Sequence, residues 1–303
     1  DMQNGVKKQT ADNQDKTRKK SDKNMNNYRK IVVADNDGLE GKYKNDYRGR
    51  VQDRNINIVP QPMFVLTYYE KHNEVKRLLH YYKYIDDKNR SRAFPSRLLI
   101  TNEETSLSEK QVTRHFASID EQTTSIVNNP HDADKRFARS MDFYLVQDLD
   151  NALEDLTQAI LCDGNYFMAY FSRAVIRYKQ MEYKKAEKSF EENPKLRMAP
   201  KASDYDLIRR DLDKVIELAP DFVYAYYNRA NVSVAMNDYR SALTDYDKAI
   251  EIDPKLADAY YNRGLVHIYL GNNRLGIQDL SKAGELGLYA AYNVIKRFTE
   301  RKE

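Results

Sequence analysis

The same wording returns in this chain at an interval of 34 residues, and this repetition limits the possible folds more than any other feature. The repeated openings are "KRFARSMDFYL" at Lys135, "AYFSRAVIRYK" at Ala169, "AYYNRANVSVA" at Ala225 and "AYYNRGLVHIY" at Ala259, with about 22 extra residues before the third. Each opening leads to a second apolar stretch: "NALEDLTQAI" at Asn151, "KKAEKSFEEN" at Lys184, "SALTDYDKAI" at Ser241 and "LGIQDLSKAG" at Leu275. Such a period is typical of stacked units that cannot bury their apolar sides alone.

Each unit is predicted to hold two short amphipathic helices. In the third unit, Ala242, Leu243, Tyr246, Ala249 and Ile250 fall at helical spacing and form one apolar stripe. Small residues recur where paired helices must touch, because larger side chains would push the backbones apart. These small residues are Ser140, Ala174, Ala230 and Gly264 in the first helices and Ala152, Ala186, Ala242 and Gly276 in the second helices.

The period, the small residues and the closing prolines Pro130, Pro220 and Pro254 together resemble the tetratricopeptide repeat (TPR), over roughly residues 133–290. The resemblance implies a mainly α fold, a right-handed α-solenoid whose first helices line a concave face. The implied array covers residues 133–303, with units near 133–166, 167–222, 223–256 and 257–290, an insertion at 191–212 and a capping helix at 291–303.

The residues before the array are predicted to form three parts. Residues 106–132 favour a long helix leading into the array, which begins with a capping box of Ser108 and Gln111. Short apolar runs at 56–59, 63–69 and 97–100 flank an amphipathic helix at 73–87, so residues 51–105 indicate a small α/β unit. Residues 1–50 hold few apolar residues and many Lys, Asp and Asn, and we expect a disordered basic linker.

A second resemblance covers nearly the whole chain. The order and wording of "VQDRNINI", "MFVLTYYEK", "RLLHYYKYIDD" and "APDFVYAYYNRAN" are similar to the C-terminal half of a family of large TPR proteins of Bacteroidota. This resemblance implies that further repeats precede Asp1 in the parent protein, and that the parent is exported to the periplasm or cell envelope.

Composition and motifs argue against an enzyme. Charged residues make up 32% of the chain, with a mean hydropathy of −0.83, which suits a solenoid with much surface per residue. Cys162 is the sole cysteine, the histidines show no metal-ligand spacing, and no glycine-rich phosphate loop or nucleophile elbow is present. We therefore expect a non-enzymatic protein with no cofactor and no metal site, and no run of eighteen apolar residues indicates a transmembrane segment.

The concave face is the predicted binding site. One column of aromatic residues holds Phe137, Phe171, Tyr227 and Tyr261, and the residues expected beside it are Val175, Asn228, Asn231, Asn262 and Leu265. Tyrosine and phenylalanine offer large contact area at low entropy cost, so this face is expected to bind a protein or peptide. The alternative is that the rings pack between helices. The lysines of a carboxylate clamp are missing from the matching positions, which favours a ligand of low charge.

Two charged columns have a structural interpretation. Arg139, Arg173, Arg229 and Arg263 repeat in step with Asp155, Asp211, Asp245 and Asp279, so we expect pairs between facing helices and not an anion site. Two other hypotheses remain open. The array could support an active unit at residues 51–105, or the basic residues 7–30 could tether the chain to nucleic acid or a membrane. No aromatic platform accompanies these basic residues and the net charge is only +4, which favours a solvated linker and makes nucleic acid an unlikely partner.

Overall fold

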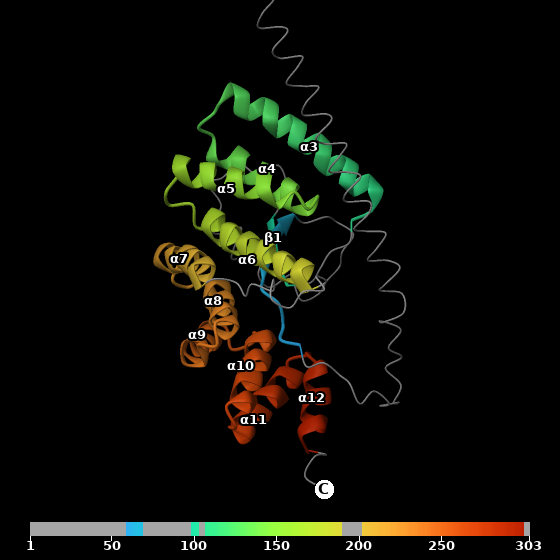
Figure 1. Ribbon diagram of the computed structural model, residues 1–303, viewed down its shortest axis with the longest axis vertical. Coiled ribbons are helices and arrows are strands. Elements are labelled where there is room, and N and C mark those ends of the chain that lie inside the picture. The colour runs from blue at the N-terminus through green and yellow to red at the C-terminus, as the bar shows by residue number, and fades with distance from the viewer. Residues whose placement is uncertain (1–58, 69–97, 103–106, 190–201, 300–303) are drawn as a thin grey trace, which may run out of the picture.

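Stacked helices build nearly all of the described part of the chain. The computed structural model describes residues 59–68, 98–102, 107–189 and 202–299. Its helices are α3 (Glu109–Asn128), α4 (Ala133–Leu145), α5 (Leu149–Cys162), α6 (Phe167–Ser189), α7 (Ala202–Leu218), α8 (Val223–Ala235), α9 (Tyr239–Ile252), α10 (Ala257–Tyr269), α11 (Asn273–Glu285) and α12 (Ala290–Thr299). They follow one another in space from α3 at one end to α12 at the other (Figure 1), as a TPR-type α-solenoid requires. Among these described helices, none combines the length and apolarity that a membrane span needs.

The repeat units are the helix pairs α4–α5, α6–α7, α8–α9 and α10–α11. Within three of these pairs the turn contains a residue with positive φ, namely Gln147, Asn237 or Gly271. The next residue caps the second helix in two cases, where Asp148 and Asp238 accept hydrogen bonds from backbone N–H groups three residues further on. The left-handed residue and the aspartate cap explain why each turn is so short.

The second unit differs from its prediction. The stretch starting at Lys184 was expected to be the second helix, but α6 continues through it to Ser189, and the second helix is α7. Ala186 therefore lies within α6, and the place of the small residue is taken by the buried Ile208. A helical pattern of apolar residues looks the same whether a helix continues or a new one begins, which is why the sequence misled here.

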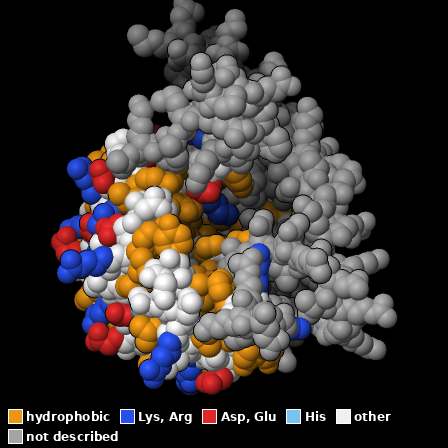
Figure 2. Space-filling model, turned by 60° about the horizontal axis from the view of Figure 1, so that its bottom comes forward, with side chains coloured by type: hydrophobic (Ala, Val, Ile, Leu, Met, Phe, Trp, Pro, Cys, Tyr) orange, Lys and Arg blue, Asp and Glu red, His pale blue; other side chains and the backbone are white. Residues whose placement is uncertain are grey.

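The last unit confirms why small residues recur. A Cβ atom on Gly264 would lie 3.0 Å from the carbonyl oxygen of Gly276, and a Cβ atom on Gly276 would lie 2.8 Å from that of Gly264. Helices α10 and α11 thus touch through their backbones at this crossing. Helix α12 packs on α11, with Tyr289 just before it 66% exposed and Tyr292 about half-exposed. In Figure 2, hydrophobic side chains form a band over this end of the molecule, with charged side chains gathered along one flank.

Helix α3 joins the array through a buried polar cluster. Its N-terminus has the predicted capping box, in which Ser108 and Gln111 bond to each other's backbone N–H groups. On its packed face, His115 Nδ1 lies 2.8 Å from Asp142 Oδ1 of α4, and the Ser118 hydroxyl donates to Asp142 Oδ2 at 2.7 Å. Burial raises the pKa of the Asp142 carboxyl, and the bonds from His115 and Ser118 oppose that rise.

Two short strands lie against the first two repeat units. Strand β1 (Val65–Tyr68) pairs antiparallel with β2 (Leu98–Thr101), with Val65 opposite Thr101 and Tyr68 opposite Leu98. Strand β1 contacts α4 and α6, and Leu66 and Ile100 are almost completely buried. The predicted strands at 63–69 and 97–100 are thus present in part. Three other predicted parts lie outside the described residues: the linker at 1–50, residues 56–58 of the strand at 56–59, and the helix at 73–87. The α/β unit at 51–105 therefore stays a prediction.

Candidate peptide-binding groove

The arginine and aspartate columns are paired inside the array. In each of the four units, the arginine Nε and Nη2 atoms donate to the two carboxylate oxygens of one aspartate. These pairs are Arg139–Asp155, Arg173–Asp211, Arg229–Asp245 and Arg263–Asp279, with donor–acceptor distances of 2.6–2.9 Å. This two-point geometry is the strong form of an Arg–carboxylate interaction. The columns therefore hold helices together, as the sequence predicted, and leave no arginine ladder for a ligand.

A third arginine bond links neighbouring units. In every case Nη1 donates to a residue sixteen positions earlier, on the second helix of the preceding unit or on α3. The acceptors are Thr123, Thr157, Asp213 and Asp247. The aspartate partners raise the pKa values of Arg229 and Arg263 further above the ordinary value, mainly because Asp245 and Asp279 accept hydrogen bonds from the guanidinium groups. Each arginine thus joins the two helices of its own unit to the helix that precedes the unit.

The concave face holds an extended segment of the chain itself. Residues 59–64 precede β1 and run from it toward α10 (Figure 1). Asn228 of α8 accepts a hydrogen bond from the backbone N–H of Phe64 at 2.9 Å and donates one to the carbonyl oxygen of Phe64, also at 2.9 Å. Asn228 is fully buried, so one amide side chain satisfies both backbone groups of a residue 164 positions away.

A second asparagine repeats this arrangement one unit later. Asn262 of α10 accepts from the backbone N–H of Gln61 at 2.7 Å and donates to the carbonyl oxygen of Gln61 at 2.9 Å. Asn228 and Asn262 are 34 residues apart and occupy the same position in successive repeats. The period of the array thus places two matching amide clamps along one groove, and they grip the first and fourth residues of the segment 61–64.

Tyr227 and Asn231 complete the polar contacts with the segment. The Tyr227 hydroxyl lies 2.9 Å from the carbonyl oxygen of Gln61 and 3.1 Å from that of Pro62, and it accepts a hydrogen bond from Asn262 Nδ2. Asn231 donates to the carbonyl oxygen of Gln61 at 3.3 Å and accepts from the Tyr246 hydroxyl. Burial raises the pKa of Tyr227 well above its ordinary value, so the hydroxyl stays protonated and able to donate.

Aromatic rings form the apolar end of the groove. The ring of Phe64 packs against Tyr224 at 4.5 Å between centroids and edge-on against Tyr227 at 5.2 Å. Phe222 in turn packs edge-on against Tyr224. Phe64 is 4% exposed, so Tyr224 and Tyr227 form an aromatic pocket that encloses its ring.

The other predicted site residues lie around this core. Phe137 and Phe171 are fully buried, and their rings pack against Tyr166 at 5.0 Å and Phe222 at 5.1 Å, so both stand between helices. Tyr261 is buried and Leu265 half-buried in the small apolar cluster formed by the last unit and α12. The structure thus brings Tyr227, Asn228, Asn231 and Asn262 together on one bound segment, and it places the remaining predicted aromatic residues in the packing of the array.

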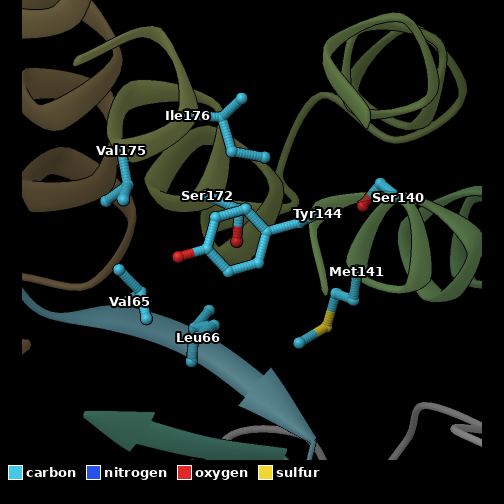
Figure 3. A pocket seen from close by; sticks show the side chains of 8 residues that line it. All are labelled: Val65, Leu66, Ser140, Met141, Tyr144, Ser172, Val175 and Ile176. Carbon is cyan, nitrogen blue, oxygen red and sulfur yellow. The ribbon is translucent and has the colours of Figure 1, made fainter. Parts of the chain in front are cut away.

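Val175 contributes to a small cavity next to the segment. Val65 and Leu66 of β1 face Met141 and Tyr144 of α4 and Val175 and Ile176 of α6, with Ser140 and Ser172 behind them (Figure 3). The volume open to the centre of a water molecule is about 10 Å³, enough for about one water. Among the described residues the hydroxyl of Ser172 has no hydrogen-bond partner. The strand and the array are therefore not fully complementary here.

Sequence reasoning missed Gln61, Phe64 and Tyr224, which belong to the same site. Asn102, directly after β2, also reaches the groove and donates to Asp258 of α10 at 2.9 Å. Two prolines in "VPQPMF" were the available signal, because proline and the residue before it favour extended backbone.

Among the described residues no cluster of His, Cys, Asp and Glu could hold a metal ion.

Comparisons with known proteins agree with this architecture. Residues 230–271 match a family model described as a TPR repeat. No curated protein sequence matches the chain. Similar solved structures include a crystal structure of MamA, at 18% identity and a TM-score of 0.49, covering 63% of this chain and 99% of that chain. The family match identifies a TPR repeat at residues 230–271, and the helix pairs stacked in chain order give the described residues the fold of a TPR-type solenoid.

Two further solved structures concern peptide-binding TPR proteins. YrrB, described as a TPR protein with an unusual peptide-binding site, is 22% identical with a TM-score of 0.34, covering 59% of this chain and 99% of that chain. The first TPR domain of Spaghetti (RPAP3), solved with the HSP90 peptide SRMEEVD, is 14% identical with a TM-score of 0.37, covering 46% of this chain and 93% of that chain. At these identities and TM-scores the two structures carry no conclusion about this chain.

Proposed function

We propose that this chain is a non-enzymatic scaffold that binds an extended protein segment in the concave groove of its TPR array. The observation that carries the proposal is the pair of amide clamps, in which Asn228 and Asn262 each hold both backbone groups of one residue in an extended segment. Such contacts read a chain by its backbone, as in other modes of extended-peptide recognition. Tyr227, Asn231, Phe137, Phe171, Val175, Tyr261 and Leu265 are the residues proposed to complete or support the site.

The chemistry of the groove supports a protein ligand of low charge. Its clamps are neutral amides and a tyrosine hydroxyl, and its apolar end is made of aromatic rings. TPR scaffolds in general act by binding and not by catalysis. On the whole-chain resemblance to exported TPR proteins of Bacteroidota, we further propose that the scaffold belongs to a cell-envelope assembly.

The packing of the strands weighs against the alternative in which residues 51–105 form the active unit. Strand β1 packs on α4 and α6 and β2 pairs with β1, and between β1 and the array the described residues leave room for about one water. The hypothesis of a basic tether concerns residues 7–30, which lie outside the described residues.

Site-specific photo-crosslinking in the native cells tests the proposed function. A photo-reactive residue replaces Leu265, which lies one turn beyond Asn262 on α10, and in a matched strain it replaces the exposed Glu251 on α9. We expect one protein to be crosslinked from position 265 and not from position 251. Equal crosslinking from both positions, or none from position 265, would contradict a groove ligand.

A further inference from the structure

We infer that residues 61–64 are a built-in ligand of the groove, and that the external partner binds by replacing them with its own extended x-Pro-apolar-Phe segment. The inference rests on the proposed function, because it names the class of segment that the same groove takes. In this structure Gln61, Pro62, Met63 and Phe64 occupy the site that the partner would use.

The spacing of the clamps defines which chain fits. Asn262 needs the N–H and carbonyl of the first residue, and Asn228 needs those of the fourth. At the second position only a carbonyl is used, by Tyr227, so proline is accepted there although it has no N–H. A proline at this point also holds the preceding residue in extended backbone, which lowers the entropy cost of binding.

Some side chains of the segment are buried against the groove, and others face outward. Met63 and Phe64 are buried at 8% and 4% exposure, whereas Pro60 and Pro62 face outward. The Phe64 ring packs in the aromatic pocket formed by Tyr224 and Tyr227. Specificity therefore falls on an apolar residue followed by an aromatic one, and the other positions are selected through backbone shape alone.

The way in which the segment is held makes it replaceable. Among the described residues, pairing with β2 begins at Val65, and the hydrogen bonds that hold Gln61 and Phe64 on the array come from side chains of α8 and α10. Further along the chain, where β1 lies against α4 and α6, the cavity at Val65 and Leu66 and the hydroxyl of Ser172, unbonded among the described residues, show incomplete complementarity between β1 and the array. Another chain with the same backbone can satisfy the same groups.

Intramolecular binding makes the built-in ligand a strong competitor. A tethered segment acts at an effective concentration of about a millimolar for a short flexible connection. The apparent affinity for an external segment falls by the fraction of molecules in which the groove is open. Weakening residues 61–64 must therefore tighten the binding of a partner segment, even though no groove residue has changed.

The experiment uses a fluorescent peptide of sequence VPQPMFVLTY, which copies residues 59–68. Its binding is measured by anisotropy to the full chain and to two opened variants, Phe64→Ala and Gln61→Pro. The second variant removes the N–H that Asn262 accepts from and alters no buried side chain. The matched control is Val59→Ala, at a position 62% exposed. Circular dichroism checks that each variant keeps the helical array.

We expect the opened variants to bind the peptide at least tenfold more tightly than the unchanged chain and the Val59→Ala control. Adding Asn228→Ala to an opened variant should abolish that gain, whereas adding Asn273→Ala, at an exposed position on α11, should keep it. A peptide with alanine in place of its phenylalanine should bind weakly to every variant.

Two results would overturn the inference: folded opened variants that fail to bind the peptide, or equal binding to opened and unchanged chains. Either result leaves the proposed function standing if the crosslinking from position 265 still identifies a partner. Conversely, peptide binding without any crosslinked partner would support the built-in ligand and remove the support for the proposed function.

Discussion

Replacing Asn228 by alanine tests whether the amide clamps hold the segment. The substitution removes both 2.9 Å hydrogen bonds to Phe64 and leaves a buried backbone N–H and a buried carbonyl without their partner. An unsatisfied buried polar group costs about 1–3 kcal/mol, so the two together predict a loss of about 2–6 kcal/mol in the free energy of unfolding. The actual value should lie toward the lower end if the freed segment moves into water.

The other two asparagines provide an internal scale. Asn262→Ala removes bonds to Gln61 that are only partly buried, so water can replace them, and we expect a loss of about 1–2 kcal/mol. Asn231→Ala removes a partly buried bond of 3.3 Å to the same carbonyl and should cost less still. Asn273→Ala, on the surface of α11, is the control and should change little.

Urea titration followed by circular dichroism gives these free energies, and hydrogen exchange at the Phe64 amide reports the clamp directly. The expected order of losses is Asn228, then Asn262, then Asn231. A loss below about 1 kcal/mol for Asn228→Ala, or an unchanged exchange rate at Phe64, would refute the reasoning, because the two backbone groups would then not depend on the clamp.

Three further predictions follow from the packing and the charges. Gly276→Ala should lower the free energy of unfolding by about 0–2 kcal/mol, because a clash costing about 1–3 kcal/mol is offset by a gain of about 1 kcal/mol in helix propensity. Gly284→Ala should be neutral or stabilising in the same urea titration, because the half-exposed ring of Tyr292 beside it can move. Arg229→Met should cost about 2–4 kcal/mol by leaving a buried aspartate unpaired, whereas Lys248→Ala should cause no measurable change. Tyr227 has a raised pKa in the folded state, so its contribution to stability is complete below the unfolded pKa of about 10 and is lost as pH rises above that value. In Tyr227→Phe the free energy of unfolding should therefore fall less steeply at alkaline pH, with tyrosinate absorbance reporting the ionisation.

The array was predictable because its signals are local and repeated. The arginine and aspartate columns recur at one spacing in every unit, so the pairing of Arg229 with Asp245 could be foreseen before any coordinates. The same holds for the small residues at the α10–α11 crossing, where Gly264 and Gly276 bring the two backbones into contact. The helix break of the second unit was not predictable, because local apolar spacing does not distinguish a long α6 from two helices.

The groove was predictable only in part, and the reason is physical. The repeat period puts Asn228 and Asn262 in equivalent positions, and the resemblance to TPR proteins, whose first helices line the concave face, implied that these residues and Asn231 face inward. Their partner follows from nothing local, because the contacts join residues 164 and 201 positions apart and involve the backbone of Gln61 and Phe64. Backbone groups are the same in every residue, so a bond to them leaves no mark on the sequence.

The path of the segment changes how the array should deform. In a simple solenoid each repeat touches only its neighbours, so the structure bends and stretches like a soft spring. Here the single segment 61–68 contacts α4 and α6 through β1 and is bonded to α8 and α10 through Asn228 and Asn262. It therefore connects the first helices of all four repeat units. Such a brace resists opening of the curvature, so the elastic stiffness of the superhelix depends on whether the groove is filled.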